Sequence, residues 1–180
     1  MRRVALEGFL ALGPDFLSPL GGTPEDEDKG RDMIGKLEAP KVTGQAVAAV
    51  RWLKAHEKST GKVAAIGFCW GVGVVNRTAV AAGSDLTAAV PYYGAQPPAA
   101  DVPKIRAELL LHYAGNDERI NAGIPAYKDA LAAAGVKHEI HTYEGAQHAF
   151  NNDTTEARYN KAAADLAWSR TIATLKRALA

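Results

Sequence analysis

Residues 66–72 read Ile-Gly-Phe-Cys-Trp-Gly-Val and place the only cysteine of the chain, Cys69, between two glycines. The apolar run at 62–68 predicts a buried strand, and the segment after Cys69 predicts a helix. The pattern Gly-x-Cys-x-Gly at a strand-to-helix turn is typical of a nucleophile elbow, with cysteine in place of the usual serine. Taken alone, the same stretch also fits a small buried cysteine that only fills space.

The glycines of this turn have a physical explanation. A tight turn forces Cys69 into a strained backbone conformation and directs its sulfur into a cleft. We expect a side chain at Gly67 or Gly71 to collide with the neighbouring strand or helix. The helix N-terminus brings partial positive charge to Cys69, which favours the thiolate, and the backbone N–H of Trp70 is a candidate oxyanion donor.

Strand-like and helix-like segments alternate outward from this turn. The predicted strands are 9–12, 62–68, 86–94, 107–115 and 137–145. The predicted helices are 42–58, a helix after Cys69, 124–134 and 156–179, with a weak helix starting in the acidic run 25–28. Such alternation predicts an α/β fold with a mostly parallel sheet and helices on both faces.

Chemistry in a parallel sheet lies in the loops at the carboxyl ends of the strands. A cysteine nucleophile needs a base, and the base needs an orienting acid. Asp117 follows the strand predicted at 107–115, and His148 lies in the loop after the last strand. Considered alone, Asp117 also fits a turn or a helix cap, and His148 also fits a polar residue at the surface. Together with Cys69 they stand in the order nucleophile, acid, histidine that an α/β-hydrolase requires.

The composition excludes several classes of protein. The 180 residues, 47% hydrophobic and 23% charged, suit one globular domain over residues 1–180. Interleaved charges with a net charge of +1 give no face for nucleic acid and no polybasic segment for a membrane. A lone cysteine allows no internal disulfide, and no apolar run approaches the roughly 20 residues of a membrane span, so we expect a cytoplasmic protein.

Neither a metal nor a cofactor is predicted. His138 and His141 are three residues apart on a predicted strand, so their side chains point to opposite faces and cannot share a metal ion. The glycines of residues 67–73 do not form a phosphate-binding loop, because no Lys-Ser or Lys-Thr pair follows them.

Four segments resemble the dienelactone hydrolase family of the α/β-hydrolase superfamily, and the similarity runs along nearly the whole chain. They are GFCWGVG (67–73), VPYYGAQPPAADV (90–102), LLLHYAGNDERINAGIPAY (109–127) and EGAQHAFNNDTTEARYN (144–160). The resemblance implies an α/β-hydrolase fold. It also implies a hydrolase of small-molecule esters or lactones in which Cys69, Asp117 and His148 form a catalytic triad and the cysteine carries a thioester.

The resemblance also points to substrate-binding residues. Tyr92 and Tyr93 match a strand-end tyrosine pair near the family's substrate pocket, and we add Asn121, from the loop that carries Asp117. Dienelactone hydrolases proper have an arginine four residues after the catalytic histidine, where it helps to hold the substrate carboxylate. Here that position is Asn152, which is neutral, so uncharged or differently shaped esters fit as well as the anionic dienelactone.

Members of the family carry further strands before the segment that resembles residues 2–22. Those strands bring a second oxyanion donor and a glutamate that pairs with the resting thiol. One of them normally lies between the strands resembling 9–12 and 62–68. We therefore expect an N-terminally truncated sheet in which these two segments pair directly, or in which a partner chain covers the open edge, and we predict a homodimer or larger oligomer.

Two other functions stay open from the sequence. A truncated relative with weak or no catalysis would serve as a binding or assembly module, although it would have no need of all three triad residues. An enzyme with the same triad would also suit a peptide or thioester bond, because the loops that form the pocket walls decide which bond is cut.

Overall fold

The computed structural model describes all residues, 1–180. Its strands are β1 (Ala64–Phe68), β2 (Ala88–Tyr92), β3 (Glu108–Asn116) and β4 (His138–Gln147). Its α-helices are α1 (Arg2–Leu6), α2 (Glu27–Gly35), α3 (Ala39–Ala55), α4 (Trp70–Ala81), α5 (Glu118–Asn121), α6 (Ile124–Ala133) and α7 (Lys161–Leu179). Three short 3₁₀ helices are η1 (Ser18–Leu20), η2 (Gly83–Asp85) and η3 (Ala99–Lys104).

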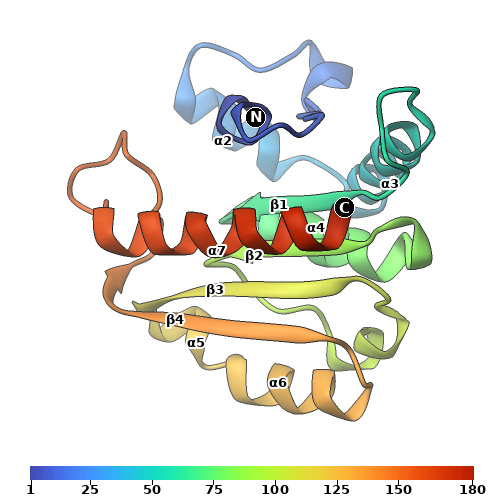
Figure 1. The fold of residues 1–180 in the computed structure, drawn as a ribbon. Helices are drawn as coiled ribbons and strands as arrows, with labels where there is room; N and C mark the ends of the chain where they lie inside the picture. The colour runs from blue at the N-terminus through green and yellow to red at the C-terminus, as the bar shows by residue number, and fades with distance from the viewer.

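The four strands form one parallel sheet in the order β1-β2-β3-β4 (Figure 1). Alternate side chains of β3 enter different cores: Leu109 and Leu111 join α3, α4 and α6, while Leu110 joins α7. This alternation is what two-sided burial of a strand requires. The predicted α/β architecture with helices on both faces is therefore confirmed.

The observed helices differ from the predicted ones mainly at their ends. Helix α3 begins three residues earlier than predicted, with Pro40 in its first turn, and ends at Ala55. Helix α7 begins at Lys161 instead of 156, because the side chain of Asn160 accepts a hydrogen bond from the backbone N–H of Ala163 and caps the helix there. No helix is both long and apolar enough to cross a membrane.

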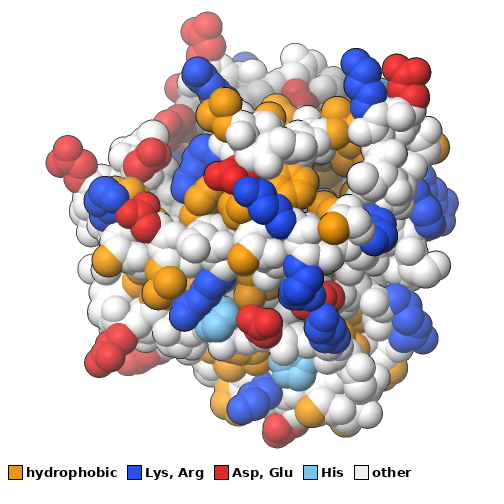
Figure 2. All heavy atoms as spheres, viewed as in Figure 1, with side chains coloured by type: hydrophobic (Ala, Val, Ile, Leu, Met, Phe, Trp, Pro, Cys, Tyr) orange, Lys and Arg blue, Asp and Glu red, His pale blue; other side chains and the backbone are white.

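The prediction of a strand at Phe9–Leu12 is wrong, and so is its direct pairing with β1. The segment has no regular secondary structure and belongs to no sheet, and β1 has β2 as its only strand neighbour. A cavity of about 820 Å³ lies between the N-terminal segment and β1, so the two backbones are not within hydrogen-bonding reach. In the space-filling view, hydrophobic side chains gather in a hollow between the N-terminal segment and α7 (Figure 2).

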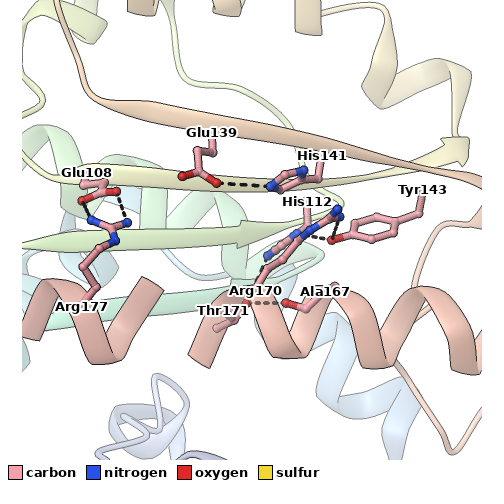
Figure 3. Close-up of polar contacts among 9 residues, drawn as sticks. All are labelled: Glu108, His112, Glu139, His141, Tyr143, Ala167, Arg170, Thr171 and Arg177. Carbon is pink, nitrogen blue, oxygen red and sulfur yellow. Dashed lines mark hydrogen bonds and ion pairs between the residues drawn. The ribbon is translucent and has the colours of Figure 1, made fainter. Parts of the chain in front are cut away.

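Buried polar side chains attach α7 to the sheet (Figure 3). The hydroxyl of Thr171 on α7 lies 2.6 Å from the Tyr92 hydroxyl and 3.1 Å from Nε2 of His112. On its other side, His112 Nδ1 lies 2.8 Å from the Tyr143 hydroxyl, which also accepts a bond from Arg170 at 3.2 Å. Three strands and one helix thus meet at His112, which is fully buried.

The donors of this network point in one direction only. Thr171 donates its hydroxyl proton to the carbonyl oxygen of Ala167, so Thr171 must accept from His112 Nε2–H. His112 Nδ1 is then the acceptor for Tyr143, whose oxygen in turn accepts from Arg170. A neutral imidazole with its proton on Nε2 satisfies every partner, and a protonated one does not. His112 is therefore a core residue with both ring nitrogens hydrogen-bonded.

We predict that His112 makes stability fall in acid. Burial, with the nearby positive charges of His141 and Arg170, lowers the pKa of His112 to about 3, below the value of about 6.5 in an unfolded chain. The stabilisation is fully present above pH ~6.5 and is lost as pH falls towards 3. Urea unfolding at pH 7.5 and at pH 4.5 measures this effect. Between these two pH values the free energy of unfolding of the parent should fall by about 2 kcal/mol more than that of His112→Gln. Equal losses in the two proteins would contradict this prediction.

Candidate active site

Cys69 lies at a sharp turn between β1, which ends at Phe68, and α4, which begins at Trp70. Its backbone has φ 52° and ψ −116°, a strained conformation for a residue with a side chain. The N–H of Cys69 donates to the carbonyl oxygen of Tyr92 at 3.2 Å, which continues the ladder between β1 and β2 into the turn. The sheet therefore holds the strained residue in place.

Only one of the two flanking glycines is required by sterics. A Cβ atom at Gly67 would lie 2.5 Å from the carbonyl oxygen of Gly71 and 2.6 Å from a methyl group of Val75. A Cβ atom at Gly71 would meet nothing within 4 Å. The expected collision is therefore confirmed at Gly67 and wrong at Gly71, because Gly71 faces open space on the first turn of α4.

Three side chains from three loops form a continuous chain of contacts. His148 Nε2 lies 3.2 Å from the sulfur of Cys69, and His148 Nδ1 lies 2.6 Å from Oδ2 of Asp117. Asp117 is only 9% exposed, and its other oxygen accepts from the N–H of Ile120 at 3.4 Å, which fixes the carboxylate at the start of α5. Because a carboxylate only accepts hydrogen bonds, Nδ1 carries the proton and Nε2 is free to accept one from the thiol.

Two further strained residues support the histidine. Tyr93, at φ 43°, packs its ring edge-on against His148 with the ring centroids 5.3 Å apart. Its N–H donates to the carbonyl oxygen of His112 at 2.7 Å, which ties it to β3. Burial raises the pKa of Tyr93, so its hydroxyl stays protonated at neutral pH. Ala149, at φ 69°, follows His148 directly.

A cleft of about 300 Å³ opens above the cysteine. It is lined by Phe68, Cys69, Tyr93, Ala149, Asn151 and Asn152. Of the predicted site residues, the structure brings Cys69, Tyr93 and Asn152 to this cleft, with His148 and Asp117 behind them.

The structure keeps two predicted substrate-binding residues away from the cleft. Tyr92 is fully buried, and its hydroxyl is bonded to Thr171. The side-chain amide of Asn121 donates to the carbonyl oxygens of Ala114 and Gly115, at 2.8 and 3.2 Å. Both residues therefore lie beneath the site: Tyr92 accepts the backbone bond of Cys69, and Asn121 ties α5 to the end of β3.

Sequence reasoning missed three of the residues that line the cleft. Phe68 is the unspecified residue inside the Gly-x-Cys pattern, and Ala149 and Asn151 are neighbours of His148 and Asn152. Their positions next to predicted site residues in the sequence could have predicted that they line the cleft. The side-chain oxygen of Asn151 is buried without a hydrogen-bond partner, which leaves it available to a ligand.

The first turn of α4 points towards the cysteine. Trp70 is the first residue of the helix, where a backbone N–H has no partner within the helix. Its half-exposed ring contacts Phe16 edge-on, with centroids 6.2 Å apart. No three histidine, cysteine or carboxylate side chains come together as a metal-binding group.

Comparisons with known proteins identify the family that the chain resembles. A model of the dienelactone hydrolase family matches residues 1–179. A Saccharolobus solfataricus protein and an Escherichia coli protein, both named "Putative carboxymethylenebutenolidase", are 36% identical over 130 residues and 30% identical over 184 residues. These alignments cover 69% and 94% of this chain, but about half (49%) and 67% of the two relatives.

A solved structure shows the same fold. The crystal structure of a dienelactone hydrolase-like promiscuous phosphotriesterase from metagenomic libraries has a TM-score of 0.72 at 23% identity. The match covers 86% of this chain and 67% of that protein. This likeness confirms the predicted α/β-hydrolase fold.

The two glycines of the elbow offer a matched pair of substitutions. We predict that Gly67→Ala destabilises the protein by about 1–3 kcal/mol, because its methyl group overlaps backbone atoms that cannot move aside. Gly71→Ala should be neutral or stabilising by about 0.5–1 kcal/mol, since alanine suits a helix better than glycine. Urea unfolding of both variants measures this difference, and equal destabilisation would rule out the steric account.

Proposed function

The chain belongs to the dienelactone hydrolase family, and we propose that it hydrolyses carboxylic ester or lactone bonds through a thioester on Cys69. The observation that carries this proposal is the line of contacts from Cys69 Sγ to His148 Nε2 at 3.2 Å and from His148 Nδ1 to Asp117 at 2.6 Å. A nucleophile, a base and an orienting acid in hydrogen-bonded order are the parts that acyl transfer needs.

The reaction proceeds in two steps. His148 takes the proton of the Cys69 thiol, and the thiolate attacks the ester carbonyl carbon to form a tetrahedral oxyanion. The oxyanion collapses to a thioester, and the departing alcohol or enol oxygen receives the proton from His148. Water then gives a proton to His148 and attacks the thioester, which releases the acid and returns the thiol. Asp117 holds the imidazole in the required tautomer throughout.

The Trp70 N–H is our proposed oxyanion donor. It stands at the N-terminus of α4, directly after the nucleophile, where the helix dipole also favours negative charge. Losing one of two such donors costs about 10²–10³ in rate in acyl-transfer enzymes. Slow turnover is therefore expected if Trp70 acts alone.

The cleft favours small and uncharged acyl groups. Its volume is about 300 Å³, and no arginine or lysine is among its lining residues. Both ends of the Asn152 side-chain amide are bonded within its own loop. The amide N–H donates to the Thr155 hydroxyl at 3.0 Å, and the amide oxygen accepts from Thr154. We propose short esters and lactones without a free carboxylate as the preferred class.

We predict that the purified chain hydrolyses p-nitrophenyl acetate and that Cys69→Ala lowers kcat by at least about 10³-fold, because the attacking atom is removed. His148→Gln should have a similar effect. Absorbance of released p-nitrophenol measures the rate. Intact mass after rapid acid quench should show one acetyl group on the parent chain and none on Cys69→Ala.

His138→Gln is the control for this experiment, since His138 lies on β4 and its Nδ1 bonds to the carbonyl oxygen of Val136. It should retain parental turnover. Undiminished hydrolysis by folded Cys69→Ala would end the proposal. A folded parent that is silent towards every ester tested would favour the alternative of a catalytically inactive binding or assembly module.

We predict that Asn152→Arg shifts preference towards anionic esters. The new guanidinium would face the substrate where the family's arginine stands, and an exposed charge pair of about 1 kcal/mol corresponds to about fivefold in kcat/KM. The ratio of rates for p-nitrophenyl hydrogen succinate and p-nitrophenyl acetate measures the shift. Asn152→Gln is the matched neutral control, and an equal ratio in both variants would exclude Asn152 as a specificity position.

We also propose that the protein acts as one domain in the cytoplasm and associates with copies of itself. The lone cysteine, which allows no internal disulfide, supports the location. The open edge of β1, beside half-exposed hydrophobic side chains, supports the association.

A further inference from the structure

The hydroxyl group of Thr171 on α7 uses its full hydrogen-bonding capacity inside the protein. It donates to the carbonyl oxygen of Ala167 at 2.9 Å and accepts from Nε2–H of His112 at 3.1 Å (Figure 3). Its second acceptor position takes the hydroxyl proton of Tyr92, at 2.6 Å. Thr171 is fully buried, and packing alone does not require its hydroxyl, because valine has the same shape. A buried hydroxyl with three bonds fixes the positions of its partners.

The two donors that Thr171 accepts from stand side by side at strand ends. Tyr92 on β2 and His112 on β3 are direct neighbours in the parallel ladder, and their rings lie 4.4 Å apart. The carbonyl oxygen of Tyr92 accepts from the N–H of Cys69 at 3.2 Å. The carbonyl oxygen of His112 accepts from the N–H of Tyr93 at 2.7 Å. The residues that Thr171 holds by their side chains thus hold the nucleophile and a cleft tyrosine by their main chains.

Packed rings connect the same strand end to the loop of His148. Phe150, two residues after His148, is fully buried. The centroid of its ring lies 6.4 Å from that of Tyr92 and 5.2 Å from that of Tyr93. In a close-packed interior, displacement of one ring displaces its neighbours. A shift of Tyr92 therefore reaches the nucleophile through the backbone and the base through these rings.

We propose that Thr171 is a positioning residue for the reaction of the cysteine. Its hydroxyl holds the two strand ends in the arrangement that sets the 3.2 Å contact between Cys69 Sγ and His148 Nε2. Thr171 touches neither of these atoms and acts only through its partners. The proposal rests on the ester hydrolase function proposed above and adds to it a residue from a helix outside the cleft. Reacting groups need this accuracy, because a misplacement of about 1 Å costs about 10²-fold in rate.

A threonine that only stabilises the fold would behave differently. Its loss would lower the free energy of unfolding and leave the folded molecules with normal chemistry. Two substitutions separate the two cases: Thr171→Val keeps the shape and removes the hydroxyl, while Thr171→Ser keeps the hydroxyl and removes a methyl group from the core. The proposal predicts that serine keeps the rate and valine does not, whichever variant is the less stable in urea.

The first test is steady-state hydrolysis of p-nitrophenyl acetate by the purified chain. Thr171→Val should lower kcat and kcat/KM together by about 10- to 100-fold, because the reacting groups are misplaced while the cleft is unchanged. Thr171→Ser should retain parental turnover. Thr174→Val is the matched control, since Thr174 is also buried on α7 but makes no hydrogen bond to His112 or Tyr92. It should retain parental turnover too.

The second test reads the contact between Cys69 and His148 without any ester. Alkylation of Cys69 by iodoacetamide is measured at pH 6, where the histidine must withdraw the thiol proton, and at pH 9.5, above the ordinary pKa of a thiol. Thr171→Val should react about fivefold more slowly than the parent at pH 6 and equally fast at pH 9.5. A parent that is silent towards esters would end the hydrolase proposal, and the alkylation rates alone would then decide this one.

Three results would overturn the proposal. The first is a folded Thr171→Val variant with parental kcat and parental alkylation at pH 6, however much stability it has lost in urea. The second is a Thr174→Val variant with the same losses as Thr171→Val, which would assign them to a general loosening of α7. The third is a Thr171→Ser variant as impaired as Thr171→Val.

Tyr92→Phe keeps the proposal testable if Thr171→Val does not fold. This variant removes one hydroxyl, and with it one of the two bonds that Thr171 accepts. It should slow the alkylation of Cys69 at pH 6 and leave the rate at pH 9.5 unchanged. Parental rates at both pH values would overturn the proposal.

Discussion

The backbone of Cys69, held at φ 52° by its neighbours, is the constraint on which the site depends. The N–H bond to Tyr92 fixes this residue from the β2 side, and the close contact of Gly67 with Gly71 fixes it from the α4 side. A side chain on such a turn stands clear of both the strand and the helix. The sulfur therefore lies 3.2 Å from Nε2 of His148.

Support for this turn extends through the sheet to α7. Tyr92 accepts the backbone bond of Cys69 and, through its own hydroxyl, bonds to Thr171 in the buried network around His112. The next residue, Tyr93, packs on His148 and bonds back to His112. One strand end thus locates both the nucleophile and the base, and a helix that contributes no side chain to the cleft holds that strand end in place.

Much of this arrangement could be predicted from the sequence, because it depends on local patterns. The Gly-x-Cys-x-Gly turn and the strand ends before Asp117 and His148 were predicted from residue order and apolar runs, and the structure brings the three side chains together. What failed depends on partners distant in the sequence. Phe9–Leu12 has the composition of a strand but no strand beside it, and Tyr92 and Asn121 turn inwards because buried carbonyl and hydroxyl groups are available to them.

The central claim is that Cys69 and His148 act as a reactive pair. The most direct measurement is the rate of alkylation of Cys69 by iodoacetamide at pH 6, for the parent and for His148→Gln, with N-acetylcysteine as reference. The account predicts that the parent reacts at least about tenfold faster than the reference and that His148→Gln loses this advantage, since the histidine removes the thiol proton. A parent that reacts no faster than the reference, or a variant as fast as the parent, would contradict it.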